Sequence, residues 1–129
     1  MAYGRSCGLR LRKGDVVLLF GPLGAGKTTL VTGLAAGLGI TSSVVSPTYT
    51  ILEVHDGPLK LFHFDFYRLS GPEELRTLDP REYYDQGVTV MEWPERMEPL
   101  WPDTRLELHL EFDPHGRWVE DVVRGGSRA

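Results

Sequence analysis

The stretch Gly21-Pro22-Leu23-Gly24-Ala25-Gly26-Lys27-Thr28 has the pattern G-x-x-x-x-G-K-[ST], which predicts a phosphate-binding P-loop. A glycine-rich turn between a strand and a helix lets several backbone N–H groups point at one polyanion, and the helix dipole favours negative charge there. In this pattern the lysine reaches the β- and γ-phosphates, and the threonine hydroxyl ligates Mg²⁺. The expected nucleotide-binding residues are therefore Gly21, Gly24, Ala25, Gly26, Lys27, Thr28 and Thr29.

The residues on either side of this stretch supply the strand and the helix that a P-loop requires. Residues 16–20, VVLLF, form a continuous apolar run, as expected for a parallel strand covered on both faces. Leu30, Leu34 and Leu38 recur at helical spacing after the loop, and Gly39 ends the pattern like a C-cap. This context disfavours the alternative, a glycine-rich turn that binds nothing.

The length and composition are those of one globular domain. Of the 129 residues, 41% are hydrophobic and 25% are charged. We expect an N-terminal segment over residues 1–12, a P-loop domain over residues 13–123 and a flexible tail over residues 124–129. No apolar run approaches the ~20 residues of a transmembrane helix, and no secretory signal is recognisable, so we expect a cytoplasmic protein without a membrane partner.

Two further global features exclude classes of site. The single cysteine, Cys7, excludes an internal disulfide and a multi-cysteine zinc site, and we interpret it as an incidental thiol. The net charge is −4, with no block of about five or more like charges, which argues against autonomous nucleic-acid binding.

Two predicted strands place an acid near their ends. Residues 51–54 and 59–67 read as a hairpin around residues 56–58, and Asp65 lies where open α/β sheets bind their ligands. A catalytic or metal-linked role and a structural hydrogen-bonding role both stay open for Asp65. Residues 88–92 end in Glu92, the general form of a Walker-B strand, whose carboxylate helps to hold Mg²⁺. His63 shares a strand face with Asp65 and is kept as a candidate.

The remaining segments are less specific. Residues 46–50, SPTYT, are either a proline-containing turn or a switch segment whose hydroxyls approach the γ-phosphate. Residues 70–75 and 79–84 read as short helices, and residues 104–112 and 117–123 as a second hairpin around 113–116. Trp93 is interpreted as a core or lid aromatic. The other histidines, His55, His109 and His115, show no metal-ligand spacing and read as surface or hairpin residues.

Taken together, these elements predict an α/β fold. The expected architecture is a P-loop NTPase-like three-layer sandwich, with a mainly parallel central sheet and antiparallel hairpin strands.

Four motifs closely resemble the bacterial TsaE family, formerly YjeE. They are GPLGAGKTTL at 21–30, SPTYT at 46–50, HFDFYRL at 63–69 and MEWPER at 91–96, and the resemblance covers residues 13–123. It implies phosphate binding by Lys27 and Mg²⁺ coordination by Thr28 and Glu92. It also implies that Asp65 acts in hydrolysis, that Thr48 belongs to a switch-like nucleotide-binding segment, and that Trp93 is the aromatic after the metal acid.

The resemblance also implies a function. Members of this family are small ATPases required for N6-threonylcarbamoyladenosine at tRNA position 37, and they work with TsaD and TsaB. We therefore expect ATP and Mg²⁺ as cofactors, TsaD-like and TsaB-like proteins as partners, and tRNA only through that complex. Family members usually carry a longer segment before the first strand, which supplies one nucleotide contact. Residues 4–11 correspond at most to a remnant of it.

From the residues alone, two other classes stay open. A small-molecule or nucleoside kinase shares the strand, loop and helix, but such kinases close an arginine-bearing lid over the phosphates. Arg68 is the only arginine that we find adjoining a site motif. The other alternative is a nucleotide-dependent binding module that holds ATP without significant turnover. Slow hydrolysis that partners accelerate is the behaviour expected from the first interpretation.

Overall fold

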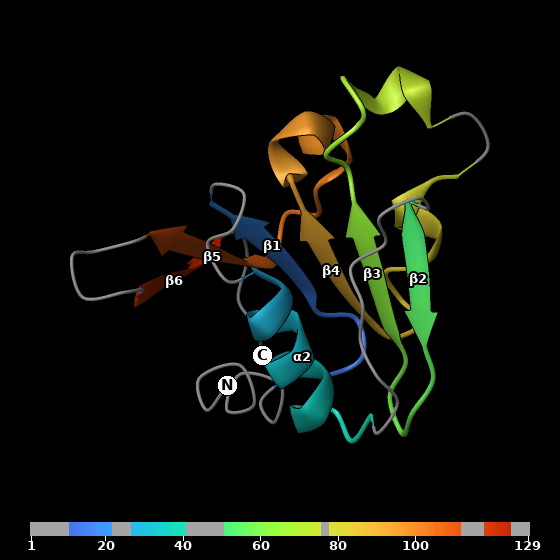
Figure 1. Cartoon of the computed structure of the whole chain (residues 1–129). Coiled ribbons are helices and arrows are strands. Elements are labelled where there is room, and N and C mark those ends of the chain that lie inside the picture. Colours follow the sequence, from blue (N-terminus) through green and yellow to red (C-terminus); the bar gives the residue numbers. More distant parts are fainter. Residues whose placement is uncertain (1–10, 22–26, 41–50, 76–77, 112–117, 125–129) are drawn as a thin grey trace.

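The computed structural model describes residues 11–21, 27–40, 51–75, 78–111 and 118–124 (Figure 1). Within these ranges the chain forms one six-stranded sheet, one α-helix and three short 3-10 helices. The elements, in chain order, are β1 (Val16–Phe20), α2 (Lys27–Gly37), β2 (Leu52–His55), β3 (Leu61–Asp65), η1 (Pro72–Glu74), η2 (Pro80–Glu82), β4 (Val88–Glu92), η3 (Pro94–Leu100), β5 (Arg105–Glu111) and β6 (Trp118–Arg124).

The sheet has the strand order β2-β3-β4-β1-β5-β6. The four inner strands run parallel to one another, whereas β2 and β6 pair antiparallel at the two edges. This confirms the predicted mainly parallel sheet with two hairpins. Because β1, β3 and β4 are parallel neighbours, their carboxyl ends meet at one edge of the sheet, where open α/β sheets bind ligands.

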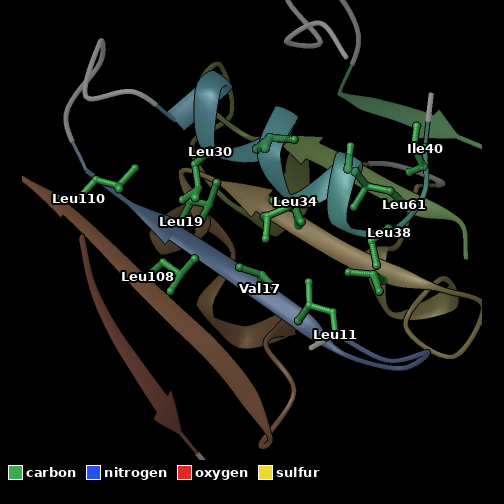
Figure 2. Packing of buried hydrophobic residues seen from close by; sticks show 14 residues of the cluster. Leu11, Val17, Leu19, Leu30, Leu34, Leu38, Ile40, Leu61, Leu108 and Leu110 are labelled. Carbon is green, nitrogen blue, oxygen red and sulfur yellow. The ribbon is translucent and has the colours of Figure 1, made fainter. Parts of the chain in front are cut away.

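One face of the sheet is covered by α2. Its leucines pack onto alternate residues of the inner strands, including Val17 and Leu19 of β1 (Figure 2). Val16 and Leu18 point to the opposite face and join a second buried cluster. The continuous apolar run of β1 therefore has a simple cause, because both of its faces are buried, as predicted.

The C-terminus of α2 is capped at Gly39, as the sequence predicts. Gly39 adopts a φ of +82°, the left-handed conformation that favours glycine at this position. The N–H of Ile40 donates to the carbonyl of Ala35 at 3.0 Å, and the N–H of Gly39 donates to the carbonyl of Ala36 at 3.1 Å. These two bonds make a Schellman motif, which satisfies carbonyls that the helix leaves unpaired.

Among the described residues, the second face is covered by 3-10 helices and aromatic side chains. Phe62, Phe64 and Phe66 pack there with Met97 of η3, in the face alternation that the sequence predicts for β3. The short helices predicted at 70–75 and 79–84 are the 3-10 turns η1 and η2. The sequence pattern did not predict η3, which begins at Pro94 and contains Pro99.

Several predictions concern residues outside the described ranges. These include most of the N-terminal segment and the tail, the turn at 113–116 and the 46–50 segment with Thr48. Of the helices that the structure describes, none has the length and apolar character needed to cross a membrane.

Candidate functional site

The predicted P-loop joins the carboxyl end of β1 to the start of α2. Strand β1 ends at Phe20 and α2 begins at Lys27, so Lys27, Thr28 and Thr29 form the first turn of the helix. The backbone N–H groups of such a first turn have no partner within the helix and favour an anion. Residues 22–26, with Gly24, Ala25 and Gly26, lie outside the described residues.

Gly21 starts this connection in a conformation that excludes side chains. Its φ is +152°, and a Cβ at this position would lie 2.9 Å from the carbonyl oxygen of Leu110 and 3.0 Å from its Cβ. The backbone at Gly21 therefore lies directly against Leu110 of β5, which only glycine permits.

We expect Gly21→Ala to destabilise the protein by about 1–3 kcal/mol, because it adds both backbone strain and a clash with backbone. Urea unfolding measures the change. Gly37→Ala is the matched control, since Gly37 lies within α2 without a positive φ. Equal stability of the two variants would contradict the close approach of Gly21 to β5.

The two candidate acids lie side by side at the ends of β3 and β4. The strand register pairs Asp65 with Glu92, and it pairs Glu92 with Leu19 of β1 on the other side. The N–H of Phe66 donates to the carbonyl of Glu92 at 3.1 Å, which continues the pairing beyond β3. Both acids thus lie on the sheet edge from which β1 leads into the predicted P-loop.

The acids differ in their surroundings. Asp65 is half-buried, and its Oδ1 accepts a hydrogen bond from the N–H of Tyr67 at 3.0 Å. This is the structural role that the sequence left open, and it holds the turn after β3. Glu92 is only 4% exposed. A catalytic role for Asp65 stays a prediction.

His63 contacts Glu92 and not Asp65. Its Nε2 lies 2.6 Å from Oε2 of Glu92, and both side chains are buried. The sequence kept His63 as a candidate because it shares a strand face with Asp65. The contact with Glu92 requires the register between β3 and β4, for which the sequence carries no local signal.

Sequence reasoning missed an aromatic and arginine cluster beside the acids. The ring of Tyr67 packs on that of Trp93 at 5.0 Å, and the Arg96 guanidinium lies 5.4 Å from the Trp93 ring centroid. Arg96 Nη1 also donates to the carbonyls of Tyr67 at 3.0 Å and Leu69 at 2.9 Å. The statement that Arg68 alone adjoins the site motifs was therefore wrong.

This cluster ties together the two turns that follow the acids. Tyr67 is two residues after Asp65, and Trp93 directly follows Glu92. Trp93 has a φ of +57°, which is unusual for a bulky residue and marks a constrained position. Trp93 is thus a partly buried packing residue between Tyr67 and Arg96.

The other described histidines are not arranged as metal ligands. His55 lies in the first hairpin as predicted, but it is buried, with its ring 6.4 Å from that of His63. Burial lowers the pKa of His55, the nearby His63 lowers it further, and Glu53 partly opposes both. His109 stacks on Phe20 at 4.5 Å. No group of three His, Cys, Asp or Glu residues that could hold a metal occurs in the described ranges.

The acids nevertheless have the donor chemistry that Mg²⁺ requires, and the magnesium site stays a prediction. Mg²⁺ in nucleotide sites is bound by one or two carboxylates together with substrate phosphates and water, so three protein ligands are not needed. Glu92 offers a hard oxygen donor at the sheet edge where β1 leads towards α2, and Asp65 is its partner in the strand register. The donor set therefore matches this ion and would not suit a soft metal.

A mainly parallel sheet, a P-loop sequence between β1 and α2, and acids at the ends of adjacent strands define a protein of the P-loop NTPase-like class. The family model described as threonylcarbamoyl adenosine biosynthesis protein TsaE matches residues 1–119. The chain belongs to the TsaE family.

Individual relatives agree with this assignment. The chain is similar to proteins named tRNA threonylcarbamoyladenosine biosynthesis protein TsaE from Treponema pallidum and Streptomyces coelicolor. It is 43% identical to the first over 84% of this chain and 81% of the relative. It is 47% identical to the second over 84% of this chain and 76% of the relative. The crystal structure of Bacillus subtilis YdiB superimposes with a TM-score of 0.77 at 35% identity, covering 97% of this chain and 78% of that one.

Proposed function

We propose that this chain is a Mg²⁺-dependent ATP-binding and ATP-hydrolysing protein that serves N6-threonylcarbamoyladenosine formation at tRNA position 37 through TsaD-like and TsaB-like partners. The observation that carries the ATPase proposal is the pairing of Asp65 with Glu92 at the sheet edge where β1 leads into the P-loop sequence. Family membership supports the pathway.

Each candidate residue has a separate task in this proposal. The loop backbone and the N-terminus of α2 bind the phosphate oxygens, and Lys27 adds positive charge near the β- and γ-phosphates. Thr28 and Glu92 would hold Mg²⁺, which when bound neutralises charge on the β- and γ-phosphate oxygens. Asp65 orients the water that attacks the γ-phosphorus in line, while the bond from that phosphorus to the β,γ-bridging oxygen breaks.

The two acids should therefore have different mutant phenotypes. In Glu92→Gln the Mg²⁺ concentration needed for tight ATP binding should rise by roughly 100-fold or more, since a ligand is lost. In Asp65→Asn the Mg²⁺ requirement should stay nearly unchanged, while kcat should fall by roughly 10²-fold. Titrating ATP binding with Mg²⁺ and measuring phosphate release separates the two effects.

Glu95→Gln is the matched control, because Glu95 is an exposed acid at the start of η3 near the same edge. It should behave as the wild type in both assays. Wild-type behaviour of Glu92→Gln or of Asp65→Asn would remove that residue from the proposed site. Phosphate release only in the presence of an acceptor molecule would favour a kinase instead.

A further inference from the structure

We propose that His63 is a positioning residue that holds the Glu92 carboxylate in one orientation and leaves its second oxygen for the metal. This inference rests on the proposed function, because it assumes that Glu92 serves Mg²⁺. It adds a role for a residue that the P-loop and Walker-B patterns do not include.

The contact joins two neighbouring strands on the face that α2 covers. His63 pairs with Val90 in the register of β3 and β4, and Glu92 is two residues further along β4 on the same face. Such diagonal neighbours are within reach of long side chains. The distance from Nε2 to Oε2 is 2.6 Å, a close hydrogen-bond contact.

Burial makes this hydrogen bond important for the acid. The side chain of His63 is 0% exposed and that of Glu92 is 5% exposed. A buried carboxylate without a hydrogen-bond donor is strongly disfavoured. A glutamate that binds a metal is a carboxylate and only accepts, so in that state His63 donates to Glu92 through Nε2. His63 thus supplies the buried side chain of Glu92 with a hydrogen-bond partner inside the sheet edge.

The contact also distinguishes the two carboxylate oxygens. Oε2 accepts from His63, whereas the described residues supply no hydrogen bond to Oε1. A carboxylate fixed through one oxygen presents the other in a defined direction. Residues that orient metal ligands in this way commonly change metal affinity or activity by roughly 10- to 100-fold when they are replaced.

His55 provides an internal comparison. It is also a buried histidine on the hairpin, and its ring lies 6.4 Å from that of His63. Among the described residues, its Nε2 has no hydrogen-bond partner. A general requirement for a buried imidazole on this hairpin would make both positions equally sensitive, whereas positioning of Glu92 makes only His63 sensitive.

The test compares His63→Leu, His63→Gln, His55→Leu and Glu92→Gln with the wild type. The readout is the Mg²⁺ concentration that gives half of the maximal ATP affinity, measured by calorimetry without turnover, together with ATP affinity in EDTA. We expect His63→Leu to raise the Mg²⁺ requirement roughly 10- to 100-fold and to leave ATP affinity in EDTA unchanged. His63→Gln keeps a donor and should stay close to the wild type, as should His55→Leu.

The outcomes separate the inference from the proposed function. If Glu92→Gln raises the Mg²⁺ requirement while His63→Leu and His55→Leu both keep the wild-type requirement, His63 does not position the acid. If His63→Leu lowers ATP affinity equally with and without Mg²⁺, its role is structural and the inference is wrong. If the wild type itself shows no Mg²⁺ dependence, the proposed function fails and the inference fails with it. In the Glu92→Gln background, His63→Leu should add no further change in Mg²⁺ requirement, which the double-mutant cycle measures.

Discussion

Replacing Lys27 with alanine is expected to abolish ATP hydrolysis and to leave the fold intact. The lysine of a P-loop acts on phosphate charge, so its removal should lower turnover by roughly 10³-fold or more and weaken ATP binding. The fold should tolerate the change because Lys27 is the first residue of α2, ahead of the buried leucines that begin at Leu30. Alanine is also the residue with the highest helix propensity.

The measurement is steady-state phosphate release together with ATP calorimetry, and urea unfolding confirms that the variant is folded. Lys60→Ala is the matched control. Its ammonium lies 3.9 Å from Asp56 beside the first hairpin, and its side chain is 54% exposed. Exposed ion pairs contribute little, so this variant should match the wild type. Unchanged ATP affinity and turnover in a folded Lys27→Ala protein would refute the nucleotide assignment.

Partner proteins are expected to accelerate hydrolysis by roughly 10³- to 10⁵-fold, the range seen when a cation is supplied to a P-loop hydrolase from outside. Arg96 follows Glu92 by four residues, and its Nη1 donates to the carbonyls of Tyr67 and Leu69. Through this nitrogen Arg96 holds the turn after β3 to η3, and we expect a partner to supply the cation that acts on the transferred phosphate.

This prediction is checked by phosphate release from the chain alone, with tRNA alone, and with TsaD-like and TsaB-like proteins of the same organism. Only the last mixture should be fast. The same partners added to Lys27→Ala should produce no acceleration, which controls for a contaminating ATPase. Rapid turnover by the isolated chain, unaffected by these proteins, would show a self-sufficient enzyme.

The strands and α2 could be predicted because each leaves a local signal. The apolar run at 16–20 reflects a strand buried on both faces, and the alternation in β3 reflects two different clusters. The period of Leu30, Leu34 and Leu38 reflects one helix on one sheet face. The hairpins follow from short Gly- and Pro-containing turns between such runs.

The side-chain contacts of the site could not be predicted, because they depend on how the strands pair with one another. The contact of His63 with Glu92 arises only once β3 and β4 are paired, and no periodicity within either strand specifies that pairing. Element η3 has no helical periodicity in its sequence, and Pro94 at its start is compatible with a helical turn as well as with the end of a strand. Arg96 lies within η3, so its place beside Tyr67 and Trp93 could not be predicted either.

We propose that ATP and Mg²⁺ bind where β1, β3 and β4 end. A crystal structure with a nonhydrolysable ATP analogue and Mg²⁺ tests this directly. We expect phosphates across the N-terminus of α2 and a metal bound by Thr28 and Glu92, directly or through one water, with distances from the metal to protein oxygens of about 2.0–2.1 Å where contact is direct. Nucleotide bound elsewhere, or a metal out of reach of Glu92, would contradict it.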